Sequence, residues 1–399
     1  MRVLMTADAV GGVWTYALDL SAALARHDIS VVLATMGPRP NEAQRAATLR
    51  LSNVSLVESD YRLEWMDDPW TDVAAAGKWL LDVAHSEAVD VVHVNGYTHA
   101  TLAWQRPVVC VAHSCVVTWW QAVHGAQPSA QWDTYRRNVA NGLNSANLVV
   151  APTEAFLAQL RSCYGFDAPC EVIRNGRPLN PFSVPPAPAE RKQGAPLERG
   201  VDVPNQAQEK LAAQSVGEPM LLGCGRLWDA AKNLHVFDAA AEGLPWPAYV
   251  IGNAVGPDGQ TFSPKALRTL GTLPHDDVES WLRRASIFVH PAVYEPFGLA
   301  VLEAAAAGCA LVLADIPTLR ELWDGAAEFH NPCDGAQLRA ALNLLIANPA
   351  KRSALAAAAQ RRAAEYSVDT TAAAYAKVYR SLTATVPRTG QPSAARAVA

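Results

Sequence analysis

The stretch from Tyr294 to Gly308, YEPFGLAVLEAAAAG, predicts a short loop that runs directly into a helix. Pro296 lacks an N–H group and its φ suits a first helical turn, so we expect the helix to begin there. The unpaired N–H groups of a first turn attract an anion, and Gly298 would let a ligand approach the backbone closely. The alanine-rich run continues the helix until Gly308 ends it in a left-handed conformation.

Two glutamates, Glu295 and Glu303, stand eight residues apart on either side of this predicted helix start. The first precedes the helix and the second lies one to two turns inside it. Such an arrangement suits a ligand with a diphosphate in the middle and hydroxyl-rich groups at both ends, because carboxylates accept hydrogen bonds from hydroxyls. A nucleotide sugar is a ligand of this kind.

The longer segment from His290 to Leu322, HPAVYEPFGLAVLEAAAAGCALVLADIPTLREL, resembles the donor site of retaining GT-B glycosyltransferases, sequence family 4 (glycosyl transferases group 1). The E-P-F-G-L core, the E-A-x-A-x-G run and the Val/Ala strand after it carry the resemblance together. It implies an enzyme that moves a hexose from a UDP- or GDP-linked sugar to a hydroxyl acceptor, with retention at the anomeric carbon. The family uses no cofactor or metal in this role, and its leaving phosphate is the favoured acceptor of the proton.

The rest of the chain favours an α/β fold. Val-rich runs near 2–7, 30–35, 90–95, 107–113, 147–152 and 170–173 alternate with helical patterns at 14–27 and 71–88, which predicts parallel strands. The same alternation returns with strands expected near 220–227, 247–253, 286–291 and 310–315, followed by helices at 334–347, 350–365 and 369–382. With the resemblance, this predicts two Rossmann-like domains that face each other across a cleft.

The expected domain boundaries follow from these patterns. We assign residues 1–177 to an acceptor domain, 178–218 to a Pro- and Gln-rich linker or insertion, and 219–366 to a donor domain. Residues 367–386 are expected to form a helix that crosses back to the N-terminal domain, as in the family, and 387–399 a disordered tail.

Composition narrows the function further. The chain has 399 residues, 50% of them hydrophobic, and a net charge of -5 without a basic stripe, which argues against nucleic acid as a partner. Seven irregularly spaced cysteines without a CxxC pair favour reduced thiols. With no signal peptide or membrane-spanning run in view, we expect a cytoplasmic protein, peripheral at the membrane at most. The sequence does not indicate an oligomeric state.

Arg226 and Lys232, in GRLWDAAKNL, are the candidate cations for the diphosphate. They follow a predicted strand, where ligands of α/β sheets bind. Negative charge grows on the diphosphate as the sugar–phosphate bond breaks, so fixed cations there stabilise the transition state. The segment also resembles the family motif G-R-L-x-x-x-K-N, with one extra residue in the loop.

The resemblance assigns roles to other positions. His113, after the strand VVCVAH, would contact the donor sugar near the reaction centre, and Glu295 would touch the transferred sugar. Glu303 would bind both ribose hydroxyls. Backbone groups would bind the rest of the donor. The phosphates would be contacted by Gly11, Gly12, Phe297, Gly298 and Leu299, and the nucleobase by Thr272 and Leu273. His290 is expected to be structural.

The acceptor is expected to be a sugar, a lipid-linked group or a small molecule, bound in the N-terminal half. Polar and aromatic residues after strands, or in one aromatic cluster, are the candidates: Asp8, Asn95, Tyr97, His99, Trp119, Trp120 and His124. The aromatic rings would stack on sugars or cover lipid tails, or they would only pack between domains. Asp8 would either face the acceptor or cap the first helix.

Two other functions remain open at this level. A GT-B relative can carry out non-transfer chemistry, as a nucleotide-sugar epimerase or a phosphorylase does, although no pyridoxal lysine is recognisable. Alternatively, the chain would be a catalytically inactive subunit that supports a partner enzyme. Retention of both glutamates and both candidate cations, Arg226 and Lys232, argues against that alternative.

Overall fold

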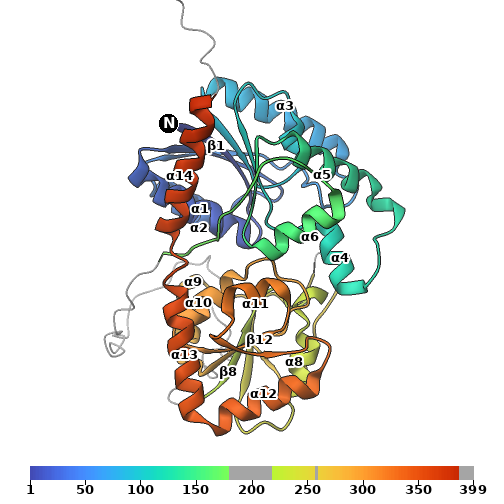
Figure 1. Ribbon diagram of the computed structural model, residues 1–399, viewed down its shortest axis with the longest axis vertical. Coiled ribbons are helices and arrows are strands. Elements are labelled where there is room, and N and C mark those ends of the chain that lie inside the picture. Colours follow the sequence, from blue (N-terminus) through green and yellow to red (C-terminus); the bar gives the residue numbers. More distant parts are fainter. Residues whose placement is uncertain (179–217, 257–258, 386–399) are drawn as a thin grey trace, which may run out of the picture. The chain divides into compact units, whose positions relative to one another are not determined.

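The computed structural model describes residues 1–178, 218–256 and 259–385 (Figure 1). They form two compact units. The first contains Met1–Gln121, Ala126–Gly176 and the C-terminal helix, and the second contains Ala122–Gly125 and the described residues from Arg177 to Ser367. The expected linker at 178–218 and tail at 387–399 lie outside the described residues, except for Pro178 and Glu218.

The first unit contains a seven-stranded sheet in the order β3-β2-β1-β4-β5-β6-β7. All of its strand pairs are parallel. Its strands are β1 (Arg2–Asp8), β2 (Ser30–Met36), β3 (Val54–Glu58), β4 (Val91–Val94), β5 (Val108–Val111), β6 (Leu148–Ala151) and β7 (Cys170–Val172). The Val-rich runs predicted every strand except β3, which lies at the sheet edge and has no fully buried residue to mark it as apolar.

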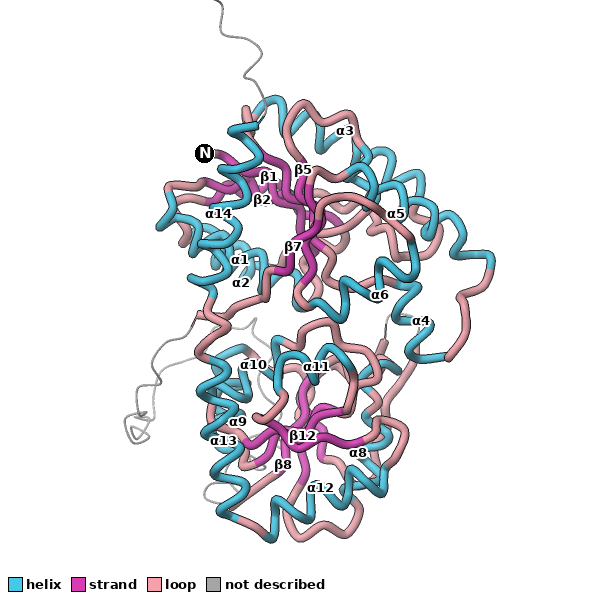
Figure 2. The backbone as a smooth tube through the Cα atoms, viewed as in Figure 1, coloured by secondary structure: helices cyan, strands magenta, loops and turns pink. Residues whose placement is uncertain are grey.

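Seven α-helices accompany this sheet, drawn in cyan around the magenta strands in Figure 2. They are α1 (Gly12–Leu24), α2 (Glu42–Leu49), α3 (Trp70–Ser86), α4 (Val116–His124), α5 (Asp133–Ser145), α6 (Glu154–Tyr164) and α14 (Val368–Thr385). Helix α14 lies beside α1 (Figure 1), and its Tyr375 and Tyr379 are fully buried in the same core as Trp14 and Leu20. The last helix of the chain is therefore part of the first unit's core.

The second unit contains a six-stranded sheet in the order β10-β9-β8-β11-β12-β13. Its strands are β8 (Leu221–Cys224), β9 (Ala248–Ile251), β10 (Arg268–Thr269), β11 (Ile287–His290), β12 (Ala310–Ala314) and β13 (Ala327–His330). The sequence patterns did not predict β10 or β13. Both lie at sheet edges; β10 is two exposed residues long and β13 is only partly buried, so neither shows a continuous apolar run.

Six α-helices lie in the described part of the second unit: α8 (Leu234–Ala241), α9 (His275–Arg284), α10 (Leu299–Ala306), α11 (Pro317–Trp323), α12 (Gly335–Ala347) and α13 (Pro349–Ala363). The three C-terminal helical patterns are confirmed as α12, α13 and α14. The buried residues Val301, Leu302 and Ala305 of α10 lie in the core with Phe288 and Trp323. This packing fixes α10 at the edge of the sheet where the candidate glutamates lie.

The predicted start of α10 at Pro296 is wrong. The helix begins at Leu299, and its N-cap is Gly298, whose φ of 89° belongs to the left-handed region. A residue in that conformation cannot lie within an α-helix, so Pro296 and Phe297 form a turn before it. The predicted end is confirmed: Gly308 has a φ of 89° just beyond the last turn.

The strand order of both sheets reverses next to one strand. After β1 the chain adds β2 and β3 on one side and then returns with β4 on the other. It repeats this around β8, with β9 and β10 on one side and β11 on the other. The loops after β1 and β4, and after β8 and β11, therefore flank the crevices in which parallel sheets bind ligands.

Candidate active site

Three glycines at the carboxyl ends of β8, β9 and β10 form the floor of the second unit's site. The N–H of Gly225 donates to Ile251 O at 3.0 Å, and the N–H of Gly252 donates to Gly271 O at 2.9 Å. A Cβ atom added to Gly252 would lie only 1.7 Å from Gly225 O. Only glycine allows this approach. Gly225 and Gly252, which follow strands β8 and β9, were a signal in the sequence that was not used.

The loop after β8 carries both candidate cations. Asp229 accepts hydrogen bonds from Arg226 Nη2 at 2.7 Å and from Ala231 N at 3.0 Å, so one carboxylate shapes the loop and orients Arg226. The Arg226 side chain is 52% exposed, whereas that of Lys232 is only 17% exposed. Arg226 therefore reaches toward solvent while Lys232 is held inside the site.

Lys232 is bonded to the first candidate glutamate. Its Nζ lies 2.7 Å from Glu295 Oε2, and His290 Nε2 donates to the same oxygen at 3.2 Å. Burial alone would raise the pKa of Glu295, but the Lys232 ammonium and the His290 hydrogen bond outweigh it and hold that pKa well below its usual range. Burial lowers the pKa of His290, so this imidazole is neutral. The cluster thus contains a fixed carboxylate and a fixed ammonium.

Residues that the sequence analysis missed hold this cluster in place. Asn233, with a φ of 56°, donates from its side chain to Pro291 O at 2.9 Å and to Pro332 O at 2.8 Å. Thr318 Oγ1 donates to Glu295 O at 2.6 Å. These bonds tie together the loops after β8, β11 and β13 and the start of α11. An Asn directly after the candidate Lys was visible in the motif, but its function as a clamp was not.

The first turn of α10 lies next to Glu295. The first intrahelical bond runs from Leu302 N to Gly298 O at 3.0 Å, so the amides of Leu299, Ala300 and Val301 precede the helical hydrogen-bond pattern. A Cβ atom added to Gly298 would lie 3.3 Å from Glu295 Cγ, so a larger residue here would press on the glutamate. Such a helix terminus favours an anionic group.

The other residues of the second unit predicted to contact the donor through their backbone are Phe297, Thr272 and Leu273. Phe297 is buried and its ring lies 5.9 Å from that of Tyr366, so only its backbone is available to a ligand. Thr272 is exposed after β10, and Leu273 packs against the core. Both follow Gly271 at the same edge of the sheet.

Glu303 lies in α10, as predicted, and faces the arginine at the start of the second unit. Its Oε1 is 2.8 Å from Arg177 Nε, and the two side chains are only 20% and 12% exposed. Burial, together with the negative charge of Glu303, raises the pKa of the Cys224 thiol to about 12. Glu303 therefore lies close to the end of β8, in the same crevice as Lys232.

In the first unit, the loop after β1 leads directly into α1. Gly11 is the N-cap of this helix, with a φ of 89°, and Gly12 is its first residue, as predicted. Asp8 Oδ1 accepts a hydrogen bond from Val10 N at 2.8 Å, so its side chain shapes the loop rather than capping the helix. Both glycines are exposed, so the backbone at this helix start is accessible.

Asn95 and His113 meet at the ends of β4 and β5. The Asn95 side chain donates to Thr6 O at 2.6 Å, so its Oδ1 is the acceptor for His113 Nε2 at 2.7 Å and for His93 Nε2 at 3.0 Å. Both rings then carry their proton on Nε2. Tyr379 of α14 donates to His93 Nδ1 at 2.6 Å, which extends the network to the last helix.

This network sets the charge of His113. Burial and the neighbouring His93 lower the pKa of His113 to about 3, so its imidazole is neutral at neutral pH. Its Nε2–H is directed at Asn95, and its Nδ1 is then a hydrogen-bond acceptor. The Tyr16 ring packs edge-on against it, with ring centroids 4.5 Å apart. His113 can therefore accept a hydrogen bond from a hydroxyl group.

The other acceptor candidates make contacts of their own. Tyr97 is buried and its hydroxyl donates to Ser114 O at 2.8 Å, while His99 Nε2 donates to Val73 O at 3.0 Å. Trp119 and Trp120 are half-buried on α4, with ring centroids 6.2 Å apart, and His124 is exposed at the end of that helix. The acceptor role of all these residues stays a prediction.

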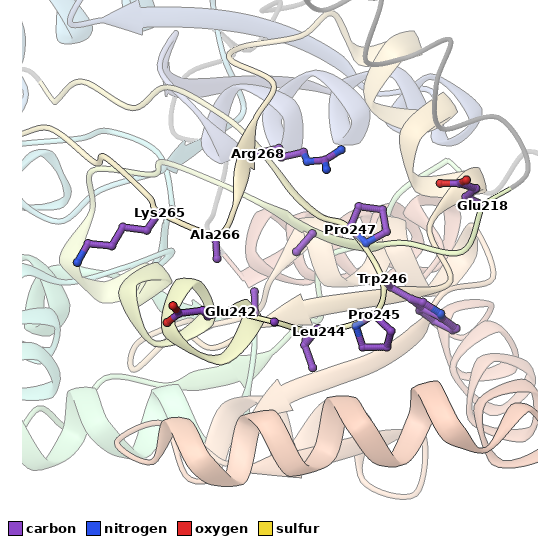
Figure 3. A pocket seen from close by; sticks show the side chains of 12 residues that line it. Glu218, Glu242, Leu244, Pro245, Trp246, Pro247, Lys265, Ala266 and Arg268 are labelled. Atoms are coloured by element: carbon purple, nitrogen blue, oxygen red, sulfur yellow. The ribbon is translucent and has the colours of Figure 1, made fainter.

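A cavity of about 460 Å³ lies elsewhere in the second unit (Figure 3). Residues before or at the starts of β8, β9 and β10 line it, among them Glu218, Pro247 and Arg268. It is therefore at the amino end of the sheet, opposite the site described above. In Figure 3 the Lys265 and Arg268 side chains point apart, so they do not converge on one ligand.

The described residues contain neither a cluster of metal-binding side chains nor a membrane-spanning helix. Within residues 1–178, 218–256 and 259–385, no three His, Cys, Asp or Glu side chains gather closely enough to hold a metal ion. Over the same residues, no helix combines the length and apolar character needed to span a membrane.

Two family models match the chain. The model for Glycosyltransferase Family 4 matches residues 10–180, and the model for Glycosyl transferases group 1 matches residues 260–362. The first match covers the loop after β1 and His113, and the second covers the loop after β11 and α10.

Relatives agree with these matches. A D-inositol 3-phosphate glycosyltransferase from Xylanimonas cellulosilytica is 28% identical over 95% of this chain and 93% of its own length. A glycogen synthase from Mycobacterium tuberculosis is 41% identical, over 29% of this chain and 28% of its own length.

Solved structures share the fold. A sucrose-phosphate synthase from Thermosynechococcus elongatus matches with a TM-score of 0.75 and 17% identity, over 97% of this chain and 100% of its own. HepE from Anabaena, in complex with UDP and glucose, matches with a TM-score of 0.71 and 19% identity, over 96% of this chain and 100% of its own. The chain thus shares with these proteins a fold that contains two parallel sheets flanked by helices.

Proposed function

Since this chain belongs to the glycosyltransferases of the GT-B fold, we propose that it moves a hexose from a UDP- or GDP-linked sugar to a hydroxyl acceptor, with retention at the anomeric carbon and without a metal. The observation that carries the proposal is the cluster of Lys232, His290 and Glu295 beside the first turn of α10. It combines a fixed ammonium, a fixed carboxylate and a helix N-terminus.

The donor would lie along this edge of the sheet. Its diphosphate would meet the first turn of α10, where the Leu299 and Ala300 amides and the helix dipole favour negative charge. Its sugar hydroxyls would donate to Glu295, whose depressed pKa keeps it an acceptor. Its ribose hydroxyls would donate to Glu303, about one turn further along α10.

Bond cleavage would be assisted by the two cations. As the sugar–phosphate bond breaks, the electron pair goes to the leaving phosphate oxygen and its charge grows. Lys232 is held in place by Glu295, and Arg226 by Asp229, so neither cation needs to reorganise during the reaction. These two side chains and the helix terminus would do the work that a divalent ion does in other transferases.

His113 would contribute from the first unit. A neutral imidazole whose Nε2–H is held by Asn95 presents Nδ1 as an acceptor. A donor sugar hydroxyl is the group that we expect it to bind. The acceptor's proton would pass to the leaving phosphate oxygen, which gains negative charge as the sugar–phosphate bond breaks.

The choice of UDP or GDP and of acceptor is less constrained. The HepE structures contain UDP, glucose or UDP-glucose, which supports a UDP-sugar as the first donor to test. The relatives' names include an inositol phosphate glycosyltransferase and mannosyltransferases, so both sugar-like and lipid-linked hydroxyl acceptors belong in the test.

The test is an assay of the purified full chain with UDP-glucose, UDP-N-acetylglucosamine and GDP-mannose, each combined with sugar-like and lipid-linked hydroxyl acceptors, in which the released nucleoside diphosphate is measured. Glu295→Gln is the matched control, because it removes the charge and keeps the size. Release by the wild type, and its loss in the control, supports the proposal; proton NMR of the product's anomeric centre checks retention. No release and no binding of UDP or GDP would contradict it, as expected for an inactive subunit.

A further inference from the structure

The ion pair between Arg177 and Glu303 is not used by the proposed reaction. Arg177 Nε lies 2.8 Å from Glu303 Oε1, and the two side chains are 12% and 20% exposed. A pair so little exposed is screened weakly by salt, and loss of either partner leaves the other charge poorly compensated. The geometry of Glu303 therefore depends on Arg177.

Arg177 is itself held by neighbours from two other segments. Its backbone N–H donates to Tyr366 O at 3.2 Å, and it forms a parallel bridge with Ser367. Its Nη2 lies 3.1 Å from Nε2 of His275, at the start of α9. The Arg177 backbone is thus anchored where the chain enters and leaves the second unit, and its guanidinium lies against the start of α9.

We propose that Arg177 is a positioning residue that holds the Glu303 carboxylate for the ribose hydroxyls, and so makes the site selective for a ribonucleotide. This inference rests on the proposed function, in which Glu303 binds the ribose. Arg177 contacts the carboxylate and is not itself assigned a contact with the donor.

The chemistry of the pair supports this role. A carboxylate has two oxygens and can accept about four hydrogen bonds, so an arginine on Oε1 is compatible with two ribose hydroxyls on the same group. The planar guanidinium orients its partner more rigidly than an ammonium would. Arg177 also places a positive charge beside a largely buried carboxylate, which offsets part of the cost of burying the negative charge.

The position of the pair agrees with a ligand contact. Glu303 lies on α10, whose first turn carries the proposed diphosphate site, and its charge reaches the Cys224 thiol at the end of β8. A nucleoside that continues from the diphosphate along α10 would bring its ribose to this carboxylate.

Calorimetry on the full chain tests the proposal with four ligands: UDP, 2′-deoxy-UDP, GDP and 2′-deoxy-GDP. The nucleotide that binds the wild type is then used with Arg177→Met, Arg177→Lys and Glu303→Gln. Arg283→Met is the matched control, because it removes an arginine that pairs with Glu279 on the surface of α9. Thermal denaturation of each variant checks that it is folded.

The wild type should bind the deoxynucleotide about tenfold to a hundredfold more weakly than the ribonucleotide, because the deoxynucleotide lacks one hydrogen bond to a charged group. In Arg177→Met this penalty should shrink to about threefold or less, with Arg177→Lys between the two and Arg283→Met unchanged. A full deoxy penalty in a folded Arg177→Met would overturn the proposal. Tighter binding of the ribonucleotide by Arg177→Met than by the wild type would also overturn it, because Arg177 would then compete with the ribose.

The proposed function fails in a different way. If the wild type binds none of the four ligands, or if Glu303→Gln keeps the full deoxy penalty, the assignment of Glu303 to the ribose is wrong. If Glu303→Gln loses the penalty and Arg177→Met keeps it, only the role of Arg177 is wrong.

Discussion

The ammonium of Lys232 and the carboxylate of Glu295 lie 2.7 Å apart, although 63 residues separate them in the chain. One comes from the loop after β8 and the other from the loop after β11, which are neighbouring strands of the second sheet. The pair lies at the carboxyl end of the strands, where the strand order reverses, and it lies beside the first turn of α10. This contact helps to keep the pKa of Glu295 well below its usual range before any ligand arrives.

Removing the cations should slow turnover more than it weakens capture of the donor. We expect Lys232→Ala and Arg226→Ala to lower kcat by about 10²–10³, as the loss of one oxyanion donor does. The loss should be larger for Lys232, which is 17% exposed, than for Arg226, at 52%. Because both act on one phosphate, the double variant should fall short of the product. Steady-state kinetics decides this; a raised KM at constant kcat would indicate uniform binding instead.

The two glutamates should separate binding from turnover. Glu303→Ala should weaken binding of the free nucleoside diphosphate by about 1.5–3 kcal/mol, the range for a hydrogen bond to a charged group. Glu295→Ala should mainly lower kcat, because its partner is the transferred sugar, which the free nucleotide lacks. Calorimetry with UDP or GDP measures the first effect and initial rates the second. Wild-type affinity in Glu303→Ala would remove the ribose assignment.

Chelation should leave the activity intact. Arg226, Lys232 and the α10 terminus supply positive charge at the proposed diphosphate, so we expect initial rates in excess EDTA to match those in buffer. The same assay with added Mg²⁺ or Mn²⁺ is the control. Complete loss of turnover in EDTA, restored by either ion, would contradict this prediction.

Stability should fall as the pH drops from about 6.5 to about 4. Burial lowers the pKa of His93 to about 4, so between these values the unfolded chain binds the proton and the folded protein does not. By linkage, His93 adds about 3 kcal/mol to the free energy of unfolding as the pH rises from about 4 to about 6.5, and this gain is complete above about pH 6.5. Urea unfolding at several pH values should show a shallower loss in His93→Gln. An identical pH dependence in both proteins would show that His93 is not the group responsible.

Asn95→Asp should move the pH profile of the enzyme. A carboxylate between the Nε2–H groups of His93 and His113 favours their charged forms and should raise the pKa of His113 from about 3. We expect the acid limb of kcat/KM to shift to higher pH, with activity near that of the wild type at pH 8. An unshifted profile would mean that the charge of His113 does not govern the rate.

Much of the framework was predictable because it is encoded locally. Buried parallel strands are continuous apolar runs, so β1, β2, β4, β5, β6, β8, β9, β11 and β12 could be predicted from the sequence. The end of α10 at Gly308 was predictable because a left-handed cap requires glycine. The edge strands β3, β10 and β13 were not, since partly exposed or very short strands lack that signal.

The sequence by itself determined the residue types of the site: two glutamates around a helix start, two cations after a strand, and a histidine after another. Only the tertiary structure decided which of them meet. It paired Lys232 with Glu295, Arg177 with Glu303 and Asn95 with His113, and it buried Tyr97. It also moved the start of α10 to Leu299, because Gly298 adopts a left-handed conformation that a local pattern does not specify. Side-chain pairing across distant loops depends on the register and order of the strands that carry them, which no short stretch of sequence contains.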